Sequence, residues 1–451
     1  MIRCKGLWIA VGVVLTGAPI ALAAEKAPGS IFPYPIKTST LENGLGVISV
    51  PFDSPGIIAY YTVVRTGSRN EVEPGLSGFA HFFEHMMFRG TDTYPQEKYN
   101  DVLKALGADS NAFTTDDWTC YHLTIPASAL AKAVEIESDR FRNLKYDEPA
   151  FQKEARAVLG EYNKGASSPF LILNEAMQDK AYTTHTYKHT TIGFLADVKN
   201  MPNQYAYSKT FFDRWYRPEN CTIVVTGDID HERLLELVKA AYGGWERGKH
   251  SVTIPQEPEQ TGPRSTALKW PLPTLPIVYL GYHIPAADPR NPDTPALGAL
   301  AQAVFGETSP LYKKLVLDEQ RVVTLMADSE MKRDPGLFTI VARIRDPKDV
   351  ESIRKELEGA LAEASKTPLS TARLTTIKQH VRYAFAGTLD NADSVAHAVG
   401  ESIAFAGRPD AWDDLYTGYD KLTPADLMRV ASRYFAPAKQ TVVTLESEAK
   451  K

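Results

Sequence analysis

Two histidines and a glutamate within five residues form the part of this sequence best suited to chemistry. The segment His81-Phe82-Phe83-Glu84-His85 places the histidines at positions i and i+4, so in a helix both imidazoles project from one face. Two imidazole nitrogens at that spacing can bind one Zn²⁺. Glu84 lies beside them and is placed to accept a proton from activated water. The alternative is a surface helix whose histidines and glutamate are only solvated.

A catalytic zinc site needs a third protein ligand and a position left open for water. Glu154 and Glu161 are seven residues apart on one expected helix over 149–163, and two helical turns bring them to the same face. One can be the ligand and the other a supporting carboxylate. A solvated acidic pair is the alternative, but the same helix carries an apolar face suited to core packing, at Phe151, Ala155, Val158 and Leu159.

The elements that must position these residues follow from the hydrophobic pattern. The histidines lie in a helix expected over 76–88. Further helices are expected over 97–106, 128–143, 231–242 and 294–305, with a long helical run ending near Tyr434. Strands are expected over 45–52, 57–65, 110–115, 119–125, 221–227, 276–284, 322–331 and 337–345, with a last strand near the C-terminus. Strands and helices that follow one another in short runs rather than in strict alternation predict an α+β fold.

Composition excludes several protein classes. The chain has 451 residues, 43% hydrophobic and 23% charged, which are ordinary values for a globular protein. Its formal net charge of −5 lacks the basic excess of a nucleic-acid-binding protein. Three cysteines are too few for a disulfide scaffold.

The first residues have the pattern of a secretory signal peptide. Arg3 and Lys5 precede an uncharged apolar run, and Ala21-Leu22-Ala23 supplies small residues for cleavage after Ala23. An uncleaved membrane anchor is the alternative. Cleavage predicts a periplasmic or secreted protein, since no second stretch approaches the roughly 18 apolar residues that span a bilayer. Cys120 and Cys221 could then pair if their strands are neighbours, which the sequence leaves open.

The chain divides near its middle. Pro255, Pro258 and Pro263 punctuate a polar stretch that is typical of a linker. On either side of it a similar segment precedes a strand, Arg214-Trp215-Tyr216-Arg217-Pro218 in the first half and Arg433-Tyr434-Phe435-Ala436-Pro437 in the second. We therefore expect two similar halves, an N-terminal domain over 24–248 and a C-terminal domain over 269–451, joined by a linker over 249–268.

The segment from His81 to Thr91, HFFEHMMFRGT, resembles the signature of the pitrilysin/insulinase-type zinc peptidases, the inverzincins. The most similar subgroup includes mitochondrial processing peptidase and its bacterial relatives. The resemblance covers the chain from Thr40 to the final strand. It implies His81, His85 and Glu161 as the zinc ligands, Glu84 as the general base and Glu154 as the supporting acid.

The same resemblance implies a substrate and an architecture. Asn111, Ala112 and Phe113 match the family's edge strand, where an extended peptide adds by main-chain hydrogen bonds. Each half becomes an antiparallel sheet covered by helices. Two subunits then enclose a chamber, so the expected substrates are short or unfolded peptides.

One family feature is missing. Many active members carry an Arg and a Tyr, seven residues apart, in the second half, where this chain has Val316 and Val323. Arg321 is out of register, and 297–305 replaces the metal motif. We therefore expect a heterodimer in which a zinc-free homologous subunit supplies the Arg/Tyr pair. A homodimer is one alternative, and a catalytically silent assembly subunit is another.

Overall fold

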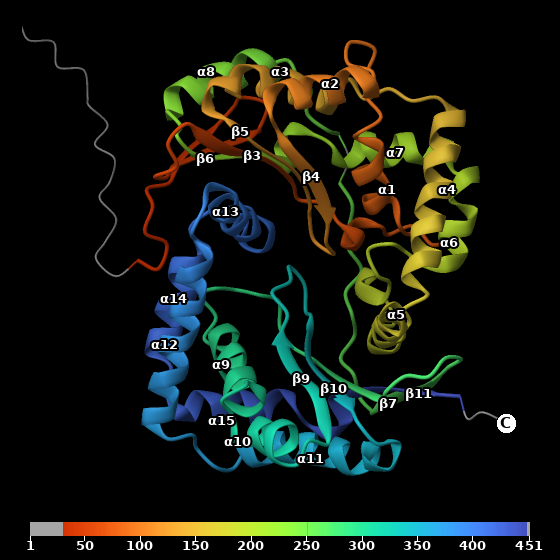
Figure 1. The fold of residues 1–451 in the computed structure, drawn as a ribbon, viewed down its shortest axis with the longest axis vertical. Helices are drawn as coiled ribbons and strands as arrows, with labels where there is room; N and C mark the ends of the chain where they lie inside the picture. The colour runs from red at the N-terminus through yellow and green to blue at the C-terminus, as the bar shows by residue number, and fades with distance from the viewer. Residues whose placement is uncertain (1–29, 250, 449–451) are drawn as a thin grey trace, which may run out of the picture.

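The computed structural model describes residues 30–249 and 251–448 and contains two sheets with helices around them (Figure 1). The leader expected over 1–23 lies outside the described residues. In the part of the chain that the structure describes, no helix is long and apolar enough to cross a membrane.

The two sheets repeat one strand arrangement. The first has the order β1-β2-β6-β3-β5-β4, and the second β7-β11-β8-β10-β9. The strands of the first are β1 (Lys37–Thr40), β2 (Gly46–Pro51), β3 (Ile57–Val64), β4 (Asp109–Thr114), β5 (Thr119–Pro126) and β6 (Cys221–Gly227). Those of the second are β7 (Arg264–Trp270), β8 (Ile277–His283), β9 (Val322–Ser329), β10 (Leu337–Ile344) and β11 (Gln440–Ser447).

Pairing directions repeat as well. β3 lies antiparallel to β5 and β6, as β8 lies antiparallel to β10 and β11. β2 with β6 and β7 with β11 are parallel, so each sheet is mixed rather than purely antiparallel. The expectation of two similar α+β halves, each an antiparallel sheet covered by helices, is confirmed. Each sheet adds one parallel pair, because a long crossover returns the last strand beside an early one.

Helices pack around the first sheet's outer face and edge. Their bounds are α1 (Phe79–Met86), α2 (Gln96–Leu106), α3 (Leu130–Asn143), α4 (Glu148–Gly165), α6 (Leu195–Asn200), α7 (Tyr205–Trp215) and α8 (His231–Tyr242). Neighbouring strand residues alternate between faces, so Tyr60 packs against these helices while Tyr61 faces the opposite side.

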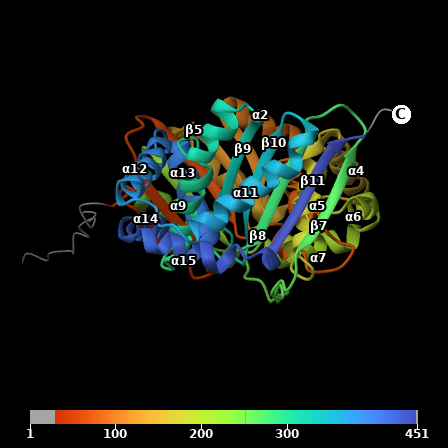
Figure 2. The same ribbon diagram turned by 90° about the horizontal axis from the view of Figure 1, so that it is seen from below.

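The halves exchange helices across their boundary. α13 (Ala392–Ala406) packs on the inner face of the first sheet, and α14 (Ala411–Lys421) packs against α13, α9 and α12. α5 (Pro169–Ala181) packs on the second sheet (Figures 1 and 2). The second sheet's other face is covered by α9 (Asp293–Phe305), α11 (Val350–Ala364), α12 (Thr371–Thr388) and α15 (Pro424–Tyr434), and α10 (Pro310–Tyr312) lies beside α9.

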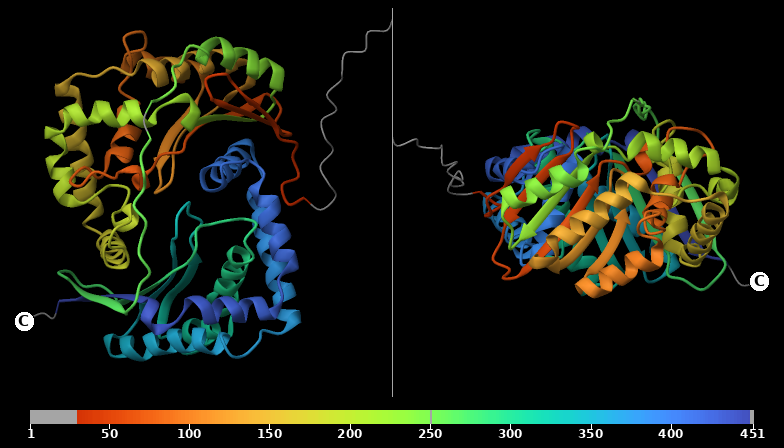
Figure 3. Two further views of the ribbon diagram at one scale, coloured as in Figure 1. Left: turned by 180° about the vertical axis from the view of Figure 1, so that it is seen from behind. Right: turned by 90° about the horizontal axis from the view of Figure 1, so that it is seen from above.

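The connection between the halves ends earlier than the expected linker. It runs from α8 to the second sheet (Figure 3) without a helix or strand in its described residues up to Pro263. β7 begins at Arg264, so residues 264–268 of the expected linker are sheet. The prolines end where the strand begins, because proline cannot supply the ladder N–H.

The two cysteines cannot pair. Cys120 on β5 and Cys221 on β6 are separated by β3, which places their strands about 9.5 Å apart. Their side chains also belong to clusters on opposite faces of the sheet, and both are free and buried. The strand order therefore excludes a disulfide between Cys120 and Cys221, a possibility that the sequence leaves open.

Candidate metal centre

The N-terminus of helix α1, which carries the two histidines, is fixed by its local contacts. Gly78 has φ = 93°, and a Cβ there would lie 2.6 Å from the Ile192 carbonyl oxygen, so the helix begins at Phe79 rather than at residue 76. The buried Glu71 carboxylate accepts hydrogen bonds from the backbone N–H groups of Gly78 and Ala80, both at 2.7 Å. It thereby satisfies donors that a helix start leaves unpaired.

Three donor groups meet between α1 and α4. One ligand atom each of His81, His85 and Glu161 lies within 4.8 Å of the others. Glu161 Oε2 is 3.7 Å from His81 Nε2 and 3.3 Å from His85 Nε2. The structure therefore brings together the three ligands that the sequence indicates, from two helices that are far apart along the chain.

The chemistry of this donor set fits zinc. Two imidazoles and one carboxylate are a catalytic zinc set that leaves one coordination position open. The His81 side chain is 11% exposed and that of Glu161 is 50% exposed, so the cluster is open towards solvent on the Glu161 side. Among the described residues it is the one group of at least three potential ligands at metal-binding distance.

Glu154 orients one of the histidines. Its buried carboxylate accepts a hydrogen bond from His85 Nδ1 at 2.9 Å through Oε1, and Arg89 bonds Oε2. Burial disfavours its charge, yet the bonds from His85 and Arg89 hold the pKa of Glu154 below its ordinary value. With the proton on Nδ1, the lone pair of Nε2 points to the cluster, a common arrangement for metal-binding histidines.

The two imidazoles have different electrostatic surroundings. Burial lowers the pKa of His81, which Glu84 and Glu161 oppose. Burial acts the same way on His85, but the hydrogen bond and charge of Glu154 outweigh it and raise the pKa of His85. Of the two imidazoles, His81 is therefore the one more strongly biased towards the neutral form, which is the form that binds metal.

Glu84 lies beside the cluster, and a residue of the first sheet donates a hydrogen bond to it. Thr114 Oγ1, at the end of β4, donates a 2.6 Å hydrogen bond to Glu84 Oε2. β4 is the edge strand of the first sheet. Along it Asn111 is exposed, Ala112 is buried and Phe113 is half-buried, so the expected substrate strand lies next to the expected base.

Sequence reasoning assigned no roles to Thr114, Arg89 or Glu71. Thr114 and Glu84 lie on different elements, and so do Arg89 and Glu154, so neither contact has a local spacing signal. Arg89 does lie one helical turn beyond His85 in the sequence, which could have suggested that it serves the same face.

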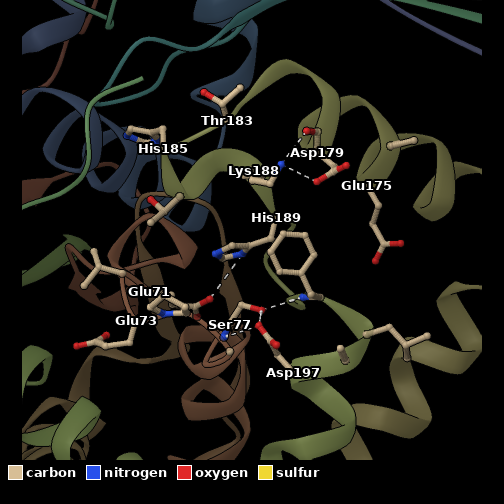
Figure 4. A pocket seen from close by; sticks show the side chains of 18 of the residues that line it. Glu71, Glu73, Ser77, Glu175, Asp179, Thr183, His185, Lys188, His189 and Asp197 are labelled. Carbon is tan, nitrogen blue, oxygen red and sulfur yellow. Dashed lines mark hydrogen bonds and ion pairs between the residues drawn. The ribbon is translucent and has the colours of Figure 1, made fainter. Parts of the chain in front are cut away.

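A separate cavity of about 920 Å³ borders the start of α1 (Figure 4). Its lining includes Glu71, Ser77, His189 and Asp197 but none of the three donor residues. The His185–His189 stretch therefore forms cavity wall. Ser77 donates to Asp197 at 2.6 Å, which ties the α1 entry loop to α6.

The described residues of the C-terminal half form no comparable centre. Val316 lies half-buried in a π-helical turn (Lys313–Asp318), and Val323 on β9 is 41% exposed. Arg321 binds Glu319 and Glu356 within its own half, so its guanidinium is engaged away from the donor cluster.

Family profiles match both halves. The profile of the insulinase family (peptidase family M16) matches residues 58–193, and that of the peptidase M16 inactive domain matches residues 204–381. The chain belongs to the insulinase family.

Similar insulinase-family proteins span nearly the whole chain. "Zinc protease PqqE" of Helicobacter pylori is 29% identical over 414 residues, 90% of this chain and 92% of that protein. Mitochondrial-processing peptidase subunit beta of Dictyostelium discoideum is 23% identical, covering 91% and 88%. The crystal structure of a protease from Helicobacter pylori superposes with a TM-score of 0.85 at 28% identity, over 92% of this chain and 99% of that one.

Proposed function

We propose that this chain is a zinc-dependent endopeptidase. The observation that carries the proposal is the convergence of His81, His85 and Glu161 beside Glu84. Relatives named as zinc proteases support the same reaction class. The chemistry is assigned to the N-terminal domain over 24–248, and the C-terminal domain over 269–451 binds no metal.

Each residue of the centre has a distinct task. His81, His85 and Glu161 would hold Zn²⁺, which when bound activates water and polarises the scissile carbonyl. Glu84 accepts the proton of the nucleophile and returns it to the leaving amine. Glu154 keeps the His85 ring oriented, and Arg89 keeps Glu154 ionised.

The substrate is an extended peptide that pairs with the free edge of β4 at Asn111, Ala112 and Phe113. Main-chain hydrogen bonds to a sheet edge need an unfolded strand and read little of its sequence. Short or unfolded peptides in a chamber between two subunits are therefore the proposed substrates.

The proposed active unit is a heterodimer. The side chains of Val316 and Val323 cannot donate hydrogen bonds to a substrate, and Arg321 is paired with Glu319 and Glu356. A zinc-free homologous subunit would supply the missing Arg/Tyr pair. The leader over 1–23 directs the chain to the periplasm or outside the cell.

The test is Glu84→Gln, assayed on quenched peptides with the chain alone and with partner co-purified from its source. Wild-type protein should cleave fully only when its partner is present, while the variant with partner should lose turnover by at least about 100-fold yet keep its zinc. Loss of zinc from the variant would contradict the role of Glu84. A zinc-replete wild-type protein that cleaves nothing, even with its partner, would favour the silent assembly subunit.

A further inference from the structure

The turns at the ends of corresponding hairpins meet between the two halves. The β4–β5 turn spans 115–118 and the β9–β10 turn spans 330–336. Lys332 Nζ lies 2.7 Å from Asp116 Oδ2, and the backbone N–H of Arg333 donates to Asp117 Oδ2 at 2.9 Å. The turn of the second half is therefore anchored directly on the turn of the first.

Lys332 is an unusual residue for such a contact. Its side chain is only 12% exposed, and its ammonium bonds Asp116 and, at 3.1 Å, Glu330. Burial opposes its charge, but Asp116 and Glu330 raise the pKa of Lys332 well above its ordinary value. A buried lysine with two carboxylate partners fixes the geometry of both, since breaking one pair would leave an uncompensated buried charge.

The β4–β5 turn is also held from its other side. Ser68 Oγ donates to Asp116 Oδ1 at 2.9 Å, and the Arg69 N–H donates to the Asp116 carbonyl at 2.8 Å. A Cβ on Gly67 would lie 2.2 Å from the Thr115 carbonyl oxygen, so the backbones are in close contact. The segment Gly67–Arg69, which holds this turn, is itself tied to the second half, because Arg69 donates a 2.5 Å hydrogen bond to Asp334.

Thr114 comes immediately before this turn and bonds Glu84. The path from the second half to the base is short: Lys332 holds Asp116, and Asp116 follows closely after Thr114, whose hydroxyl donates to Glu84 Oε2. A displacement of the turn would move that hydroxyl, and misplacement of a catalytic group by about 1 Å can cost about 100-fold in rate.

We propose that the β9–β10 turn of the C-terminal half positions the catalytic base, acting through Lys332, Asp116 and Thr114 on Glu84. This inference rests on the proposed function, in which Glu84 is the base. It gives the metal-free half a task in catalysis. Thr114 and Lys332 are positioning residues, because each acts on the reaction through Glu84.

The test is a double-mutant cycle on the full chain with any co-purified partner. Thr114→Val removes the hydroxyl at constant shape and should lower kcat about 10- to 100-fold, with little change in KM or zinc content. Thr114→Ser keeps the hydroxyl and should stay within about threefold of wild type. Lys332→Met should show the Thr114→Val signature, a lower kcat with little change in KM or zinc content.

The decisive measurement is the combination Thr114→Val/Lys332→Met. If Lys332 acts through Thr114, the combination is no slower than the slower single variant, because coupled residues are non-additive. Multiplying effects in folded variants would overturn the proposal. Where Lys332→Met does not fold, Lys332→Met/Asp116→Asn removes one of the two carboxylate charges left without a partner and takes its place in the cycle.

Failure of the inference differs from failure of the proposed function. An inactive Glu84→Gln variant together with fully active Thr114→Val and Lys332→Met variants would reject only the positioning role. A Glu84→Gln variant as active as wild type would reject the base itself.

Discussion

Helices α1 and α9 follow equivalent strands of the two halves, yet their polar residues do different work. α1 carries His81, Glu84 and His85 towards α4. α9 is buried along most of its length, and its Asp293 accepts bonds from Arg429, Arg433 and Tyr434. The same scaffold position therefore holds a partly open face of potential metal ligands in one half and a satisfied structural ion cluster in the other.

The polar groups of the two helices also differ in their exposure to solvent, which determines what a substitution there should affect. The donor cluster remains open on one side, at Glu161, whereas the Asp293 carboxylate is only 3% exposed. A metal site needs that opening, while a buried carboxylate needs full pairing. Substitutions should consequently affect metal and turnover in the first half and stability in the second.

The largest effect is expected from His85→Ala. Loss of one of three ligands should reduce bound zinc from about one equivalent to under about 0.1 and peptide hydrolysis by over about 1000-fold. Metal analysis after dialysis measures the first, and a quenched-peptide assay the second. Gln302→Ala on α9 is the matched control and should keep both. Full zinc retention by the His85→Ala variant would contradict the claim that α1, unlike α9, supplies metal ligands.

Glu154→Gln should produce a smaller change of the same kind. The amide still reaches His85 but loses the charge that Arg89 and His85 bind, so zinc affinity should fall about 10- to 100-fold. Competition with a chelator gives the affinity. Gln152→Glu, a charge change at a partly exposed position on the same helix, should leave it unaltered. An unchanged affinity in Glu154→Gln would remove the supporting role.

Asp293→Ala tests the other half. Removal of the carboxylate leaves Arg429, Arg433 and Tyr434 without their shared partner, so the free energy of unfolding should fall by about 2–3 kcal/mol. This is below the full cost of breaking a buried pair, because both arginines are partly exposed. Urea unfolding measures it. Zinc stoichiometry should not change; zinc loss in a folded variant would mean that the halves are not separable in this way.

The smallest effect is expected from Glu401→Gln. Glu401 lies on α13, the helix that covers the first sheet. Burial and the nearby Asp328 raise the pKa of Glu401 to about 6. The folded state therefore holds this proton while the unfolded chain loses it, so stability falls as pH rises from about 4.5 to 6 and stays reduced above. The variant escapes that cost and should gain about 1 kcal/mol at pH 7.5, after allowance for partial exposure.

Thermal unfolding at pH 7.5 and pH 5 gives the comparison, and the gain should shrink at pH 5. Glu232→Gln on α8, an exposed residue in the first half, is the charge-matched control and should show no such pH dependence. An equal gain at both pH values would indicate a cause other than the ionisation of Glu401.

Local spacing explains which parts of the site could be predicted. His81 and His85 share a face because the helical repeat dictates it, and Glu154 and Glu161 do so for the same reason. The strands around β3 and β6 were also predictable, since their buried residues are nearly continuous. These features depend on short stretches of sequence, and the division into halves depends on the similar segments that precede β6 and β11.

Features that depend on strand order or long-range packing were not predictable. The separation of Cys120 from Cys221 follows from β3 lying between their strands, which neither segment encodes by itself. The helix exchange of α5 and α13 is of the same kind, because an amphipathic pattern does not say which sheet its apolar face will cover. Residues 264–268 of β7 fell within the expected linker, because the proline-punctuated polar stretch runs directly up to this strand.

A crystal structure of the zinc-loaded chain with anomalous scattering data at the zinc edge tests the proposed metal centre most directly. One strong peak is expected between α1 and α4, within about 2.0–2.2 Å of His81 Nε2, His85 Nε2 and a Glu161 carboxylate oxygen. A peak elsewhere, or no peak at full zinc loading, would contradict it.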